Sequence, residues 1–299
     1  MGPNHTARAQ LAEPHCSSST RGKTGSQRAL PLMPAQFVRR RKKQPMRFVD
    51  RFQALFFDMN GTFMFDHDRL GRGEDFFATY RKIGGHRLAD CEVRELVLQT
   101  CDSLRRDYDD PACFESFPSL LDAVTTHTGL RGADAHDIAN VIAAHEVGQV
   151  PSWAARTLQA FATTHPLALV TNVWAPQEAW RDAFARSGVS HVFKHQAFSS
   201  SIGVVKPSPH LFLVALHAMK VDSAAALFIG DSIERDIRPA KQLGFSTVLV
   251  GPNGRDTEAD LVVSSIAELL RPLAESDIEV IARFHATSWS VAGSPERSR

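Results

Sequence analysis

Apolar and polar residues follow one another along the chain in a pattern that predicts an α/β fold. Short apolar runs end abruptly in polar residues, as buried strands of a parallel sheet do, at 54–57 (ALFF), 167–170 (LALV), 226–229 (ALFI), 247–250 (TVLV) and 260–263 (DLVV). Helical patterns separate most of these runs, at 178–188, 208–220 and 238–244. Strands that alternate with helices predict a doubly wound parallel sheet, which binds its ligands at the carboxyl ends of the strands.

The alternation is interrupted between the first and the second apolar run. This stretch shows no convincing strand and carries helical patterns at 73–84, 91–108, 116–128, 132–147 and 152–164. Gly129, Gly132 and Gly148 stand where helices would end. We therefore predict a helical insertion, or cap, at 66–165, with the core at 46–65 and 166–272. The insertion follows the first strand directly, so it should lie over the strand ends like a lid.

The first 45 residues differ in kind from the rest of the chain. They hold nine basic residues and one acid, a net charge of +8 that leaves −7 for the remainder, and they show no apolar periodicity. We predict a disordered basic leader at 1–45. It could be a transit-type peptide, a basic arm for nucleic acid or a membrane surface, or the product of a start codon placed too far upstream. We favour the last interpretation, because Met46 stands just before the first residues with core character.

Composition narrows the class of protein. A chain of 299 residues with 43% hydrophobic residues can bury a full core, and its four cysteines show no Cys-x-x-Cys spacing, which favours a reducing compartment. No apolar run approaches the roughly 18 residues of a membrane span. We expect a cytoplasmic protein with no membrane or specific nucleic-acid partner. Neither the oligomeric state nor the role of a tail at 273–299 can be predicted.

Three of the predicted strands end in polar residues that suit one reaction. These residues are Asp58 after the first strand, Thr171 and Asn172 after the second, and Asp231 and Ser232 after the run at 226–229. The ends of parallel strands converge at one edge of a sheet. A carboxylate nucleophile, a hydroxyl group and a carboxylate able to bind a hard cation would suit phosphoryl transfer through an aspartyl phosphate. Lys206, just before a predicted helix, could neutralise the transferred group.

These segments resemble the four motifs of the haloacid dehalogenase (HAD) superfamily, in the same order and at similar spacing. They are DMNGT at 58–62, TN at 171–172, Lys206 in KPSP, and GDSIERD at 230–236, and the resemblance covers about residues 52–270. The helical insertion resembles that of the branch whose cap lies between the first and second motifs. The resemblance implies a Rossmann-like core, a Mg²⁺ cofactor and, as in most members, phosphatase or phosphomutase activity on a small phosphorylated metabolite.

The resemblance also implies a role for each motif residue. The phosphoryl group would be attacked by Asp58 and held by Thr171, Asn172 and Lys206. The metal would be ligated by Asp58, the backbone carbonyl of Asn60 and Asp231. Ser232 and Asp236 would be supporting residues. Asp236 would orient Lys206 or the water shell of the metal.

Asn60 departs from the family pattern. Family phosphatases usually carry there a second aspartate, which protonates the leaving alkoxide and later takes a proton from the attacking water. An amide does neither, although its backbone carbonyl is retained. We expect slow turnover of simple monoesters, or a long-lived aspartyl phosphate, with acyl phosphates least affected. Asp66 and Asp68 are considered as substitute acids, although solvated hinge residues are the simpler interpretation.

Other interpretations remain open from the sequence. A dehalogenase would use the same aspartate against carbon without Mg²⁺, but the presence of Asp231 favours a metal and phosphorus. A binding or regulatory protein on the same scaffold would explain Asn60, while retention of the other motif residues speaks against it. Substrate contacts in the cap are considered for Arg81, Arg105 and Arg106. The histidines form no zinc pattern.

Overall fold

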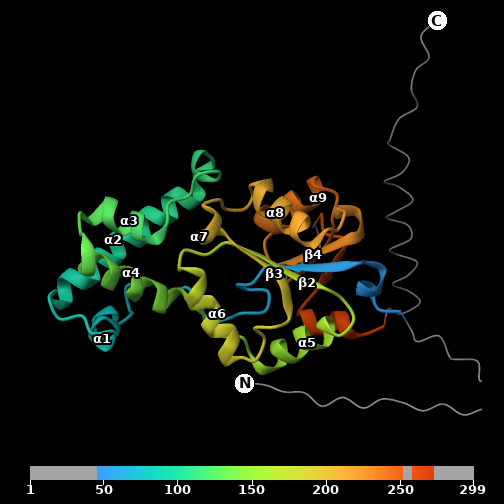
Figure 1. Cartoon of the computed structure of the whole chain (residues 1–299), viewed down its shortest axis with the longest axis horizontal. Helices are drawn as coiled ribbons and strands as arrows, with labels where there is room; N and C mark the ends of the chain where they lie inside the picture. The colour runs from blue at the N-terminus through green and yellow to red at the C-terminus, as the bar shows by residue number, and fades with distance from the viewer. Residues whose placement is uncertain (1–45, 252–257, 273–299) are drawn as a thin grey trace, which may run out of the picture. The chain divides into compact units, whose positions relative to one another are not determined.

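Six parallel strands form one sheet in the order β3-β2-β1-β4-β5-β6. Figure 1 shows the sheet with helices around it. This computed structural model describes residues 46–251 and 258–272, so the predictions for the leader and the tail lie outside the described residues. The strands are β1 (Ala54–Phe57), β2 (Leu167–Thr171), β3 (Phe193–Phe198), β4 (Ala226–Gly230), β5 (Ser246–Val250) and β6 (Leu261–Val263). The predicted α/β class with a parallel sheet is confirmed.

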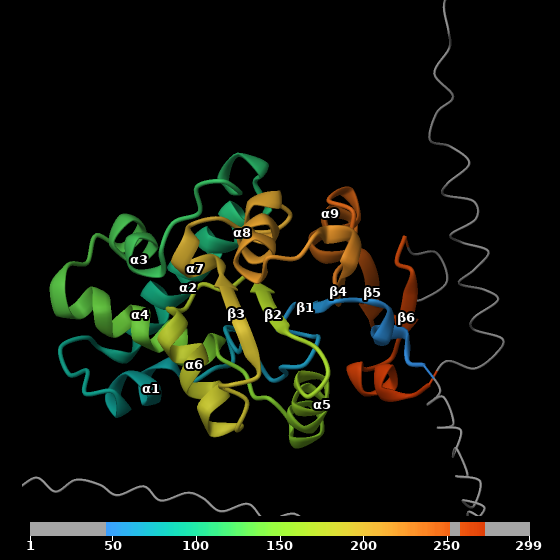
Figure 2. The same ribbon diagram turned by 45° about the vertical axis from the view of Figure 1, so that its right-hand side comes forward.

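The sheet is covered on both faces, which explains why its central strands are apolar throughout. Every residue of β1, β2 and β4 is buried. On one face Phe212 of α8 (Pro209–Met219) packs on Phe228 of β4, with ring centroids 4.9 Å apart. On the other face the ring centroid of Phe161 in α5 (Ser152–Ala162) lies 6.0 Å from that of Phe57 in β1. Figure 2 shows α8 and α9 on one side of the sheet and α5 on the other.

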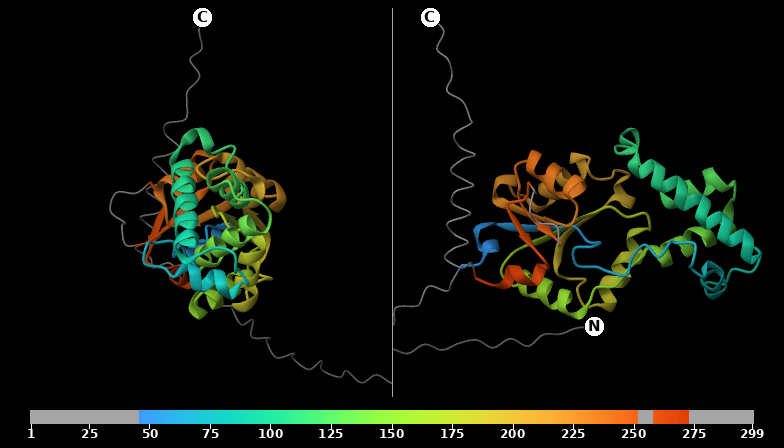
Figure 3. Two further views of the ribbon diagram at one scale, coloured as in Figure 1. Left: turned by 90° about the vertical axis from the view of Figure 1, so that its left-hand side faces the viewer. Right: turned by 180° about the vertical axis from the view of Figure 1, so that it is seen from behind.

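Four helices between β1 and β2 pack on one another at one end of the sheet (Figure 3). They are α1 (Phe76–Lys82), α2 (Asp90–Asp109), α3 (Leu120–Thr128) and α4 (Gly132–Glu146). This arrangement agrees with the expected cap. The helix α5 also falls in the predicted insertion at 66–165, but it packs against the sheet and η5 (Ile266–Leu270). The exact boundary of the cap domain stays a prediction.

The two linkers that join the cap helices to the core run side by side. Phe65 and Gln149 exchange backbone hydrogen bonds of 2.9 and 2.7 Å, and the N–H of Asp68 donates to the carbonyl of Glu146 at 3.0 Å. A Cβ atom on Gly148 would stand 2.4 Å from the Phe65 carbonyl oxygen, so this crossing requires a glycine. The paired linkers define how α4 approaches the sheet.

The remaining elements connect the strands. They are α6 (Gln177–Arg186), α7 (Ser199–Ile202), α9 (Arg238–Gln242), the π-helical turn η4 (Ile233–Ile237) and the short 3₁₀ turns η1 (Phe48–Arg51), η2 (Pro111–Cys113) and η3 (Ser223–Ala225). No helix in the described part of the chain combines the length and apolar character needed to cross a membrane. Cys91, Cys101 and Cys113 are free thiols.

Candidate active site

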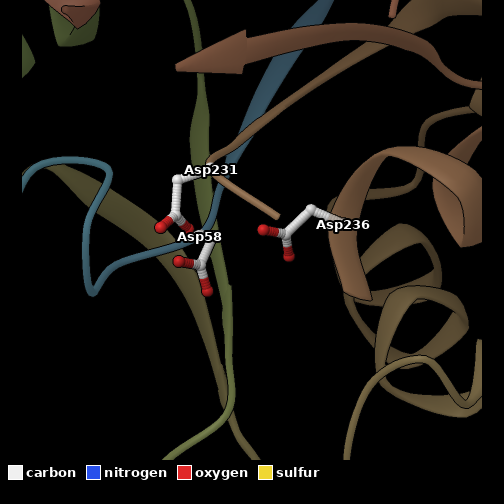
Figure 4. Close-up of side chains that lie close together, drawn as sticks. All are labelled: Asp58, Asp231 and Asp236. Atoms are coloured by element: carbon white, nitrogen blue, oxygen red, sulfur yellow. The ribbon is translucent and has the colours of Figure 1, made fainter. Parts of the chain in front are cut away.

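The strand order brings the predicted site residues together. Asp58 follows β1, which pairs with both β2 and β4, so that Thr171 at the end of β2 and Asp231 after β4 flank it. Figure 4 shows Asp58, Asp231 and Asp236 turned toward one another. One oxygen from each of these carboxylates lies within 4.8 Å of the others. The convergence expected from the sequence is therefore present in the structure.

A tight turn after Asp58 holds the nucleophile candidate in place. The carbonyl of Met59 accepts backbone hydrogen bonds of 3.0–3.2 Å from Thr62, Phe63 and Met64. Gly61 adopts a φ of +79°, and a Cβ atom there would stand 2.1 Å from Oδ2 of Asp231. The turn therefore needs glycine both for its backbone conformation and for the approach of the second carboxylate.

Lys206 is buried between two carboxylates. Its Nζ donates to Oδ1 of Asp58 at 2.6 Å and to Oδ1 of Asp236 at 2.5 Å. Burial works against the ammonium form, but attraction to Asp236 and Asp58 prevails and raises the pKa of Lys206. The other oxygen of Asp236 accepts the backbone N–H of Ser232 at 3.0 Å. Asp236 thus contacts Lys206, and its role in orienting the lysine or the water shell of the metal stays a prediction.

The cluster carries more negative charge than Lys206 neutralises. Asp231 is exposed as a residue, yet its carboxyl group lies among protein atoms, and this desolvation together with the charges of Asp58 and Asp236 raises its pKa to about 7. Burial likewise raises the pKa of Asp236 to about 6, despite the nearby ammonium group. Three carboxylates and one lysine form an oxygen-rich site that lacks positive charge, so its residues fit a hard divalent cation. The ligand role expected for the Asn60 carbonyl remains a prediction.

Two side-chain oxygens beside this cluster lack a partner. The hydroxyl of Thr171 and Oδ1 of Asn60 are buried and make no hydrogen bond to the residues that the structure describes. Buried polar atoms without partners are rare, because each carries the cost of lost hydration. Both atoms are free to bond to a ligand or water. Thr171 therefore fits its predicted contact with a phosphoryl oxygen.

Comparison with known proteins indicates the family. A model of the HAD-hydrolase-like family matches residues 204–269, a range that includes Lys206, Asp231 and Asp236. A solved HAD phosphatase from Thermococcus onnurineus has a TM-score of 0.50 at 21% identity, with 73% of this chain and 95% of that chain covered. Residues 204–269 are therefore similar to HAD-like hydrolases in sequence, and the described fold is that of a HAD protein.

Further relatives of the HAD-like protein differ in the chemistry that their names give. A 2-haloacid dehalogenase from Pseudomonas syringae pv. Tomato DC3000 has a TM-score of 0.51 at 23% identity, covering 78% of this chain and 99% of that chain. Identities this low show the shared fold alone. A glyceraldehyde 3-phosphate phosphatase from Methanopyrus kandleri is 32% identical over 30% of this chain and 42% of its own length. A phosphoserine phosphatase from Thermus thermophilus is 35% identical over 37% of this chain and 44% of its own length. The chain spans less than half the length of these two curated relatives.

Asn172 of the HAD-like protein uses its amide to hold the Lys206 segment. Its Oδ1 accepts the backbone N–H of Lys206 at 2.8 Å, and its Nδ2 donates to the Lys206 carbonyl at 3.0 Å and to the Tyr108 hydroxyl at 2.9 Å. The phosphate contact that the sequence suggested for Asn172 stays a prediction.

Other polar residues considered in the sequence lie in the linkers and the cap. Asp66 and Asp68 are exposed, with φ angles of 55° and 53°, and within the described residues no hydrogen bond or ion pair joins them to the Asp58 cluster. Arg81 donates to the carbonyl of Gly85 and Arg105 to that of Leu70. Their proposed roles as substitute acids or substrate contacts remain predictions.

Three residues that connect the cap to the motif loops were not predicted from the sequence. Tyr108 and Glu146 come from the cap helices, and Arg235 comes from the fourth motif. Arg235 lies within the fourth motif, at 230–236, but nothing in the sequence indicated that it contacts Tyr108. Tyr108 and Glu146 gave no signal, because their contacts join segments far apart in the chain.

Proposed function

We propose that this HAD-like protein takes a phosphoryl group from a small phosphorylated metabolite onto Asp58, in a Mg²⁺-dependent reaction. The observation that carries the proposal is the placement of Lys206, which touches Asp58 while Asp236 holds it from the other side. The names of the curated relatives, a glyceraldehyde 3-phosphate phosphatase and a phosphoserine phosphatase, support a small phosphate ester as the substrate class.

The residues around Asp58 supply the chemistry of the first step. A carboxylate oxygen of Asp58 forms a bond to phosphorus while the bond to the leaving oxygen breaks, which gives an aspartyl phosphate. The ammonium group of Lys206 and the unpartnered hydroxyl of Thr171 would bind the phosphoryl oxygens. A Mg²⁺ ion held by Asp58 and Asp231 would offset the negative charge of the phosphoryl group and of the cluster.

Asn60 determines which leaving groups this site can handle. An alkoxide needs a proton as it departs, and the amide of Asn60 is no acid at neutral pH. Its unpartnered Oδ1 is only an acceptor, so it can orient a water molecule or a hydroxyl group without accepting a proton. The carboxylate that leaves an acyl phosphate needs no proton. Acyl phosphates should therefore react faster than simple monoesters, and the aspartyl phosphate should hydrolyse slowly.

A phosphate-release screen tests the proposal. Sugar phosphates, phosphoamino acids, nucleotides and acyl phosphates are compared with Mg²⁺ and with a chelator, using the wild type, Asn60→Asp and Asp58→Asn. We expect release that depends on Mg²⁺, favours acyl phosphates in the wild type and disappears in Asp58→Asn. Equal release by the wild type and Asp58→Asn would contradict the proposal.

A ligand-binding or regulatory role is the second candidate, and the observation that favours it is Asn60. A site that keeps Asp58, Lys206 and Asp231 but lacks the acid could hold a phosphorylated ligand without turning it over. In that case the screen would show no phosphate release, even in Asn60→Asp, while calorimetry would show that the wild type binds a phosphorylated compound of the same panel.

A dehalogenase reaction has less support. The cluster of carboxylates around Lys206 favours a cation, whereas attack on carbon by Asp58 would need none. Halide release from a 2-haloacid that continues in the presence of a chelator would overturn the phosphoryl-transfer proposal in favour of this chemistry.

A further inference from the structure

The last turn of α2 reaches from the cap to the catalytic loops through Tyr108. Its hydroxyl accepts a hydrogen bond of 2.9 Å from Nδ2 of Asn172, in the second motif. The guanidinium of Arg235, in the fourth motif, lies over the Tyr108 ring with its Cζ 3.6 Å from the ring centroid. Arg235 also donates to the backbone carbonyl of Tyr108 at 2.8 Å. One cap residue therefore contacts two catalytic motifs.

Both partners of Tyr108 also hold the backbone of Lys206. Asn172 bonds to the N–H and the carbonyl of Lys206, at 2.8 and 3.0 Å, and Arg235 donates to the same carbonyl at 2.8 Å. Each partner thus bonds Tyr108 on one side and Lys206 on the other. Since a hydrogen-bond network restrains each member through its neighbours, the position of Tyr108 bears on that of Lys206.

We infer that Tyr108 is a positioning residue that couples docking of the cap to placement of Lys206. With α2 docked, Tyr108 fixes the amide of Asn172 and the guanidinium of Arg235, and these fix the lysine segment beside Asp58. With α2 withdrawn, the two side chains lose their common partner and the segment loosens. The structural part of this coupling is independent of the reaction, while its effect on turnover rests on the proposed phosphoryl transfer.

The hydroxyl group distinguishes this role from simple packing. The Tyr108 ring also packs edge-on against Phe117, with centroids 6.2 Å apart, and a phenylalanine would keep that contact. The hydroxyl is a partly buried polar group whose partner is the Asn172 amide. Burial raises the pKa of Tyr108, so it remains a neutral phenol at physiological pH.

Tyr80, the other tyrosine of the chain, provides a matched control. Its ring is buried inside the cap, and its hydroxyl accepts the backbone N–H groups of Arg87 and Leu88 at 2.9 and 3.1 Å. Tyr80→Phe removes a buried hydroxyl without touching the second or fourth motif. A loss caused by general destabilisation of the cap should therefore appear in both tyrosine variants.

The experiment compares Tyr108→Phe with Tyr80→Phe in the full chain. The first readout is amide hydrogen exchange at Lys206, whose N–H bonds to Asn172, without any ligand. The second is phosphate release with Mg²⁺ across several acyl phosphates and monoesters. We expect faster exchange at Lys206 and a fall in kcat of about 3- to 10-fold, the range for one neutral hydrogen bond, in Tyr108→Phe. The fall should be similar for all substrates, with KM little changed, and Tyr80→Phe should match the wild type in both readouts.

Two results would overturn the inference. One is exchange at Lys206 and kcat in Tyr108→Phe equal to those of the wild type. The other is equal losses in the two tyrosine variants. If Tyr108→Phe fails to fold, Arg235→Lys keeps the charge but loses the planar stacking, and the same two readouts apply to it. A wild type without phosphate release would count against the proposed function alone, because the exchange measurement would still test the coupling.

Discussion

Lys206 is held between Asp58 and Asp236, and at the scale of single residues this arrangement explains the electrostatics of the site. The ammonium group bonds to one oxygen of each carboxylate, while Asp231 lies beside them and forms no ion pair with a side chain in the described part of the chain. The raised pKa values of Asp231 and Asp236, about 7 and 6, show that the cluster still favours additional positive charge. A divalent cation would supply that charge.

Asn60→Asp should raise the hydrolysis of phosphate monoesters. The carboxyl group restores a proton donor and acceptor beside Asp58, which typically contributes roughly 10²-fold or more to the rate. The measurement is kcat/KM with Mg²⁺ on a monoester and on an acyl phosphate, because kcat/KM reports the transfer to Asp58 and not the later hydrolysis that both substrates share. The monoester should gain the larger factor, because only its leaving group needs a proton. Unchanged monoester rates in a folded Asn60→Asp protein would show that residue 60 has no acid–base role.

Gly61→Ala should weaken metal binding. Its Cβ atom would stand 2.1 Å from Oδ2 of Asp231 and would impose a side chain at a φ of +79°. We expect the Mg²⁺ concentration that gives half-maximal phosphate release to rise about 10- to 100-fold, as happens when a residue that supports a metal ligand is removed. Gly71→Ala is the control, because its Cβ atom meets open space. Similar Mg²⁺ titrations for the two variants would contradict the assignment of Asp231.

The main site residues could be predicted because each stands at a strand end, where the chain itself places it. Asp58, Thr171 and Asp231 needed only the strand boundaries, and Lys206 needed only the charge of the group to be transferred. Tyr108 could not be predicted in this way. Its role depends on where a cap helix ends in space, and the periodicity of α2 does not contain that information.

At the scale of elements, α4 ends in a buried carboxylate that ties the cap to the core. Both oxygens of Glu146 accept backbone N–H groups, from Trp174 at 2.7 Å and Ala175 at 2.5 Å. Only Val173 separates these two residues from the second motif, so the end of α4 supports the loop that follows Thr171 and Asn172. Glu146 is also bonded through its carbonyl to the other linker, at Asp68.

Glu146 should make stability depend on pH. Burial raises its pKa from 4.5 to about 8, despite the two N–H donors, so the folded protein retains a proton that the unfolded chain loses above pH 4.5. The stabilising contribution of that proton is complete below pH 4.5 and is lost as the pH rises to about 8. We expect the free energy of unfolding of the wild type to fall with pH across this window more steeply than that of Glu146→Gln.

Chemical denaturation from pH 5 to pH 9 measures this difference. Glu146→Gln loses one acceptor for the two N–H groups, so it should be less stable than the wild type at low pH, and the gap should narrow as the pH rises. All other titrating groups are shared and largely cancel. Parallel stability curves for the two proteins would refute the assigned pKa shift.

The elements were predictable where their burial is uniform. The five predicted strands are present, because each is an apolar run. The edge strand β3 was missed, since its sequence FKHQAF is partly exposed and contains Lys194, His195 and Gln196. The helix α5 was recognised as a helix, but its packing on the sheet depends on partners such as η5 that lie far along the chain.

At the scale of the whole described molecule, the cap helices and the core are joined at several points. Besides the linkers and Tyr108, the segment after η2 pairs with the segment before Lys206. The N–H of Val205 donates to the Phe114 carbonyl at 2.9 Å, and that of Phe117 donates to the Gly203 carbonyl at 2.8 Å. Lys206 therefore stands in a segment that the cap contacts from two sides.

Mg²⁺ should stabilise the folded protein. A cation that binds the cluster of the folded state and not the unfolded chain raises the Tm with concentration, by mass action. We expect a rise in Tm with added Mg²⁺ in the wild type and little or none in Asp231→Asn. Asp182→Asn, at an exposed aspartate of α6, is the matched control and should respond like the wild type. An equal rise in all three proteins would indicate nonspecific binding.

The most direct test of phosphoryl transfer to Asp58 is mass spectrometry of the intact protein after incubation with acetyl phosphate and Mg²⁺. We expect a mass increase of one phosphoryl group, located on the peptide that contains Asp58, absent with a chelator and absent in Asp58→Asn. The group should be lost faster from Asn60→Asp than from the wild type. A wild-type protein that gains no mass, or gains it at another residue, would rule out phosphoryl transfer to Asp58.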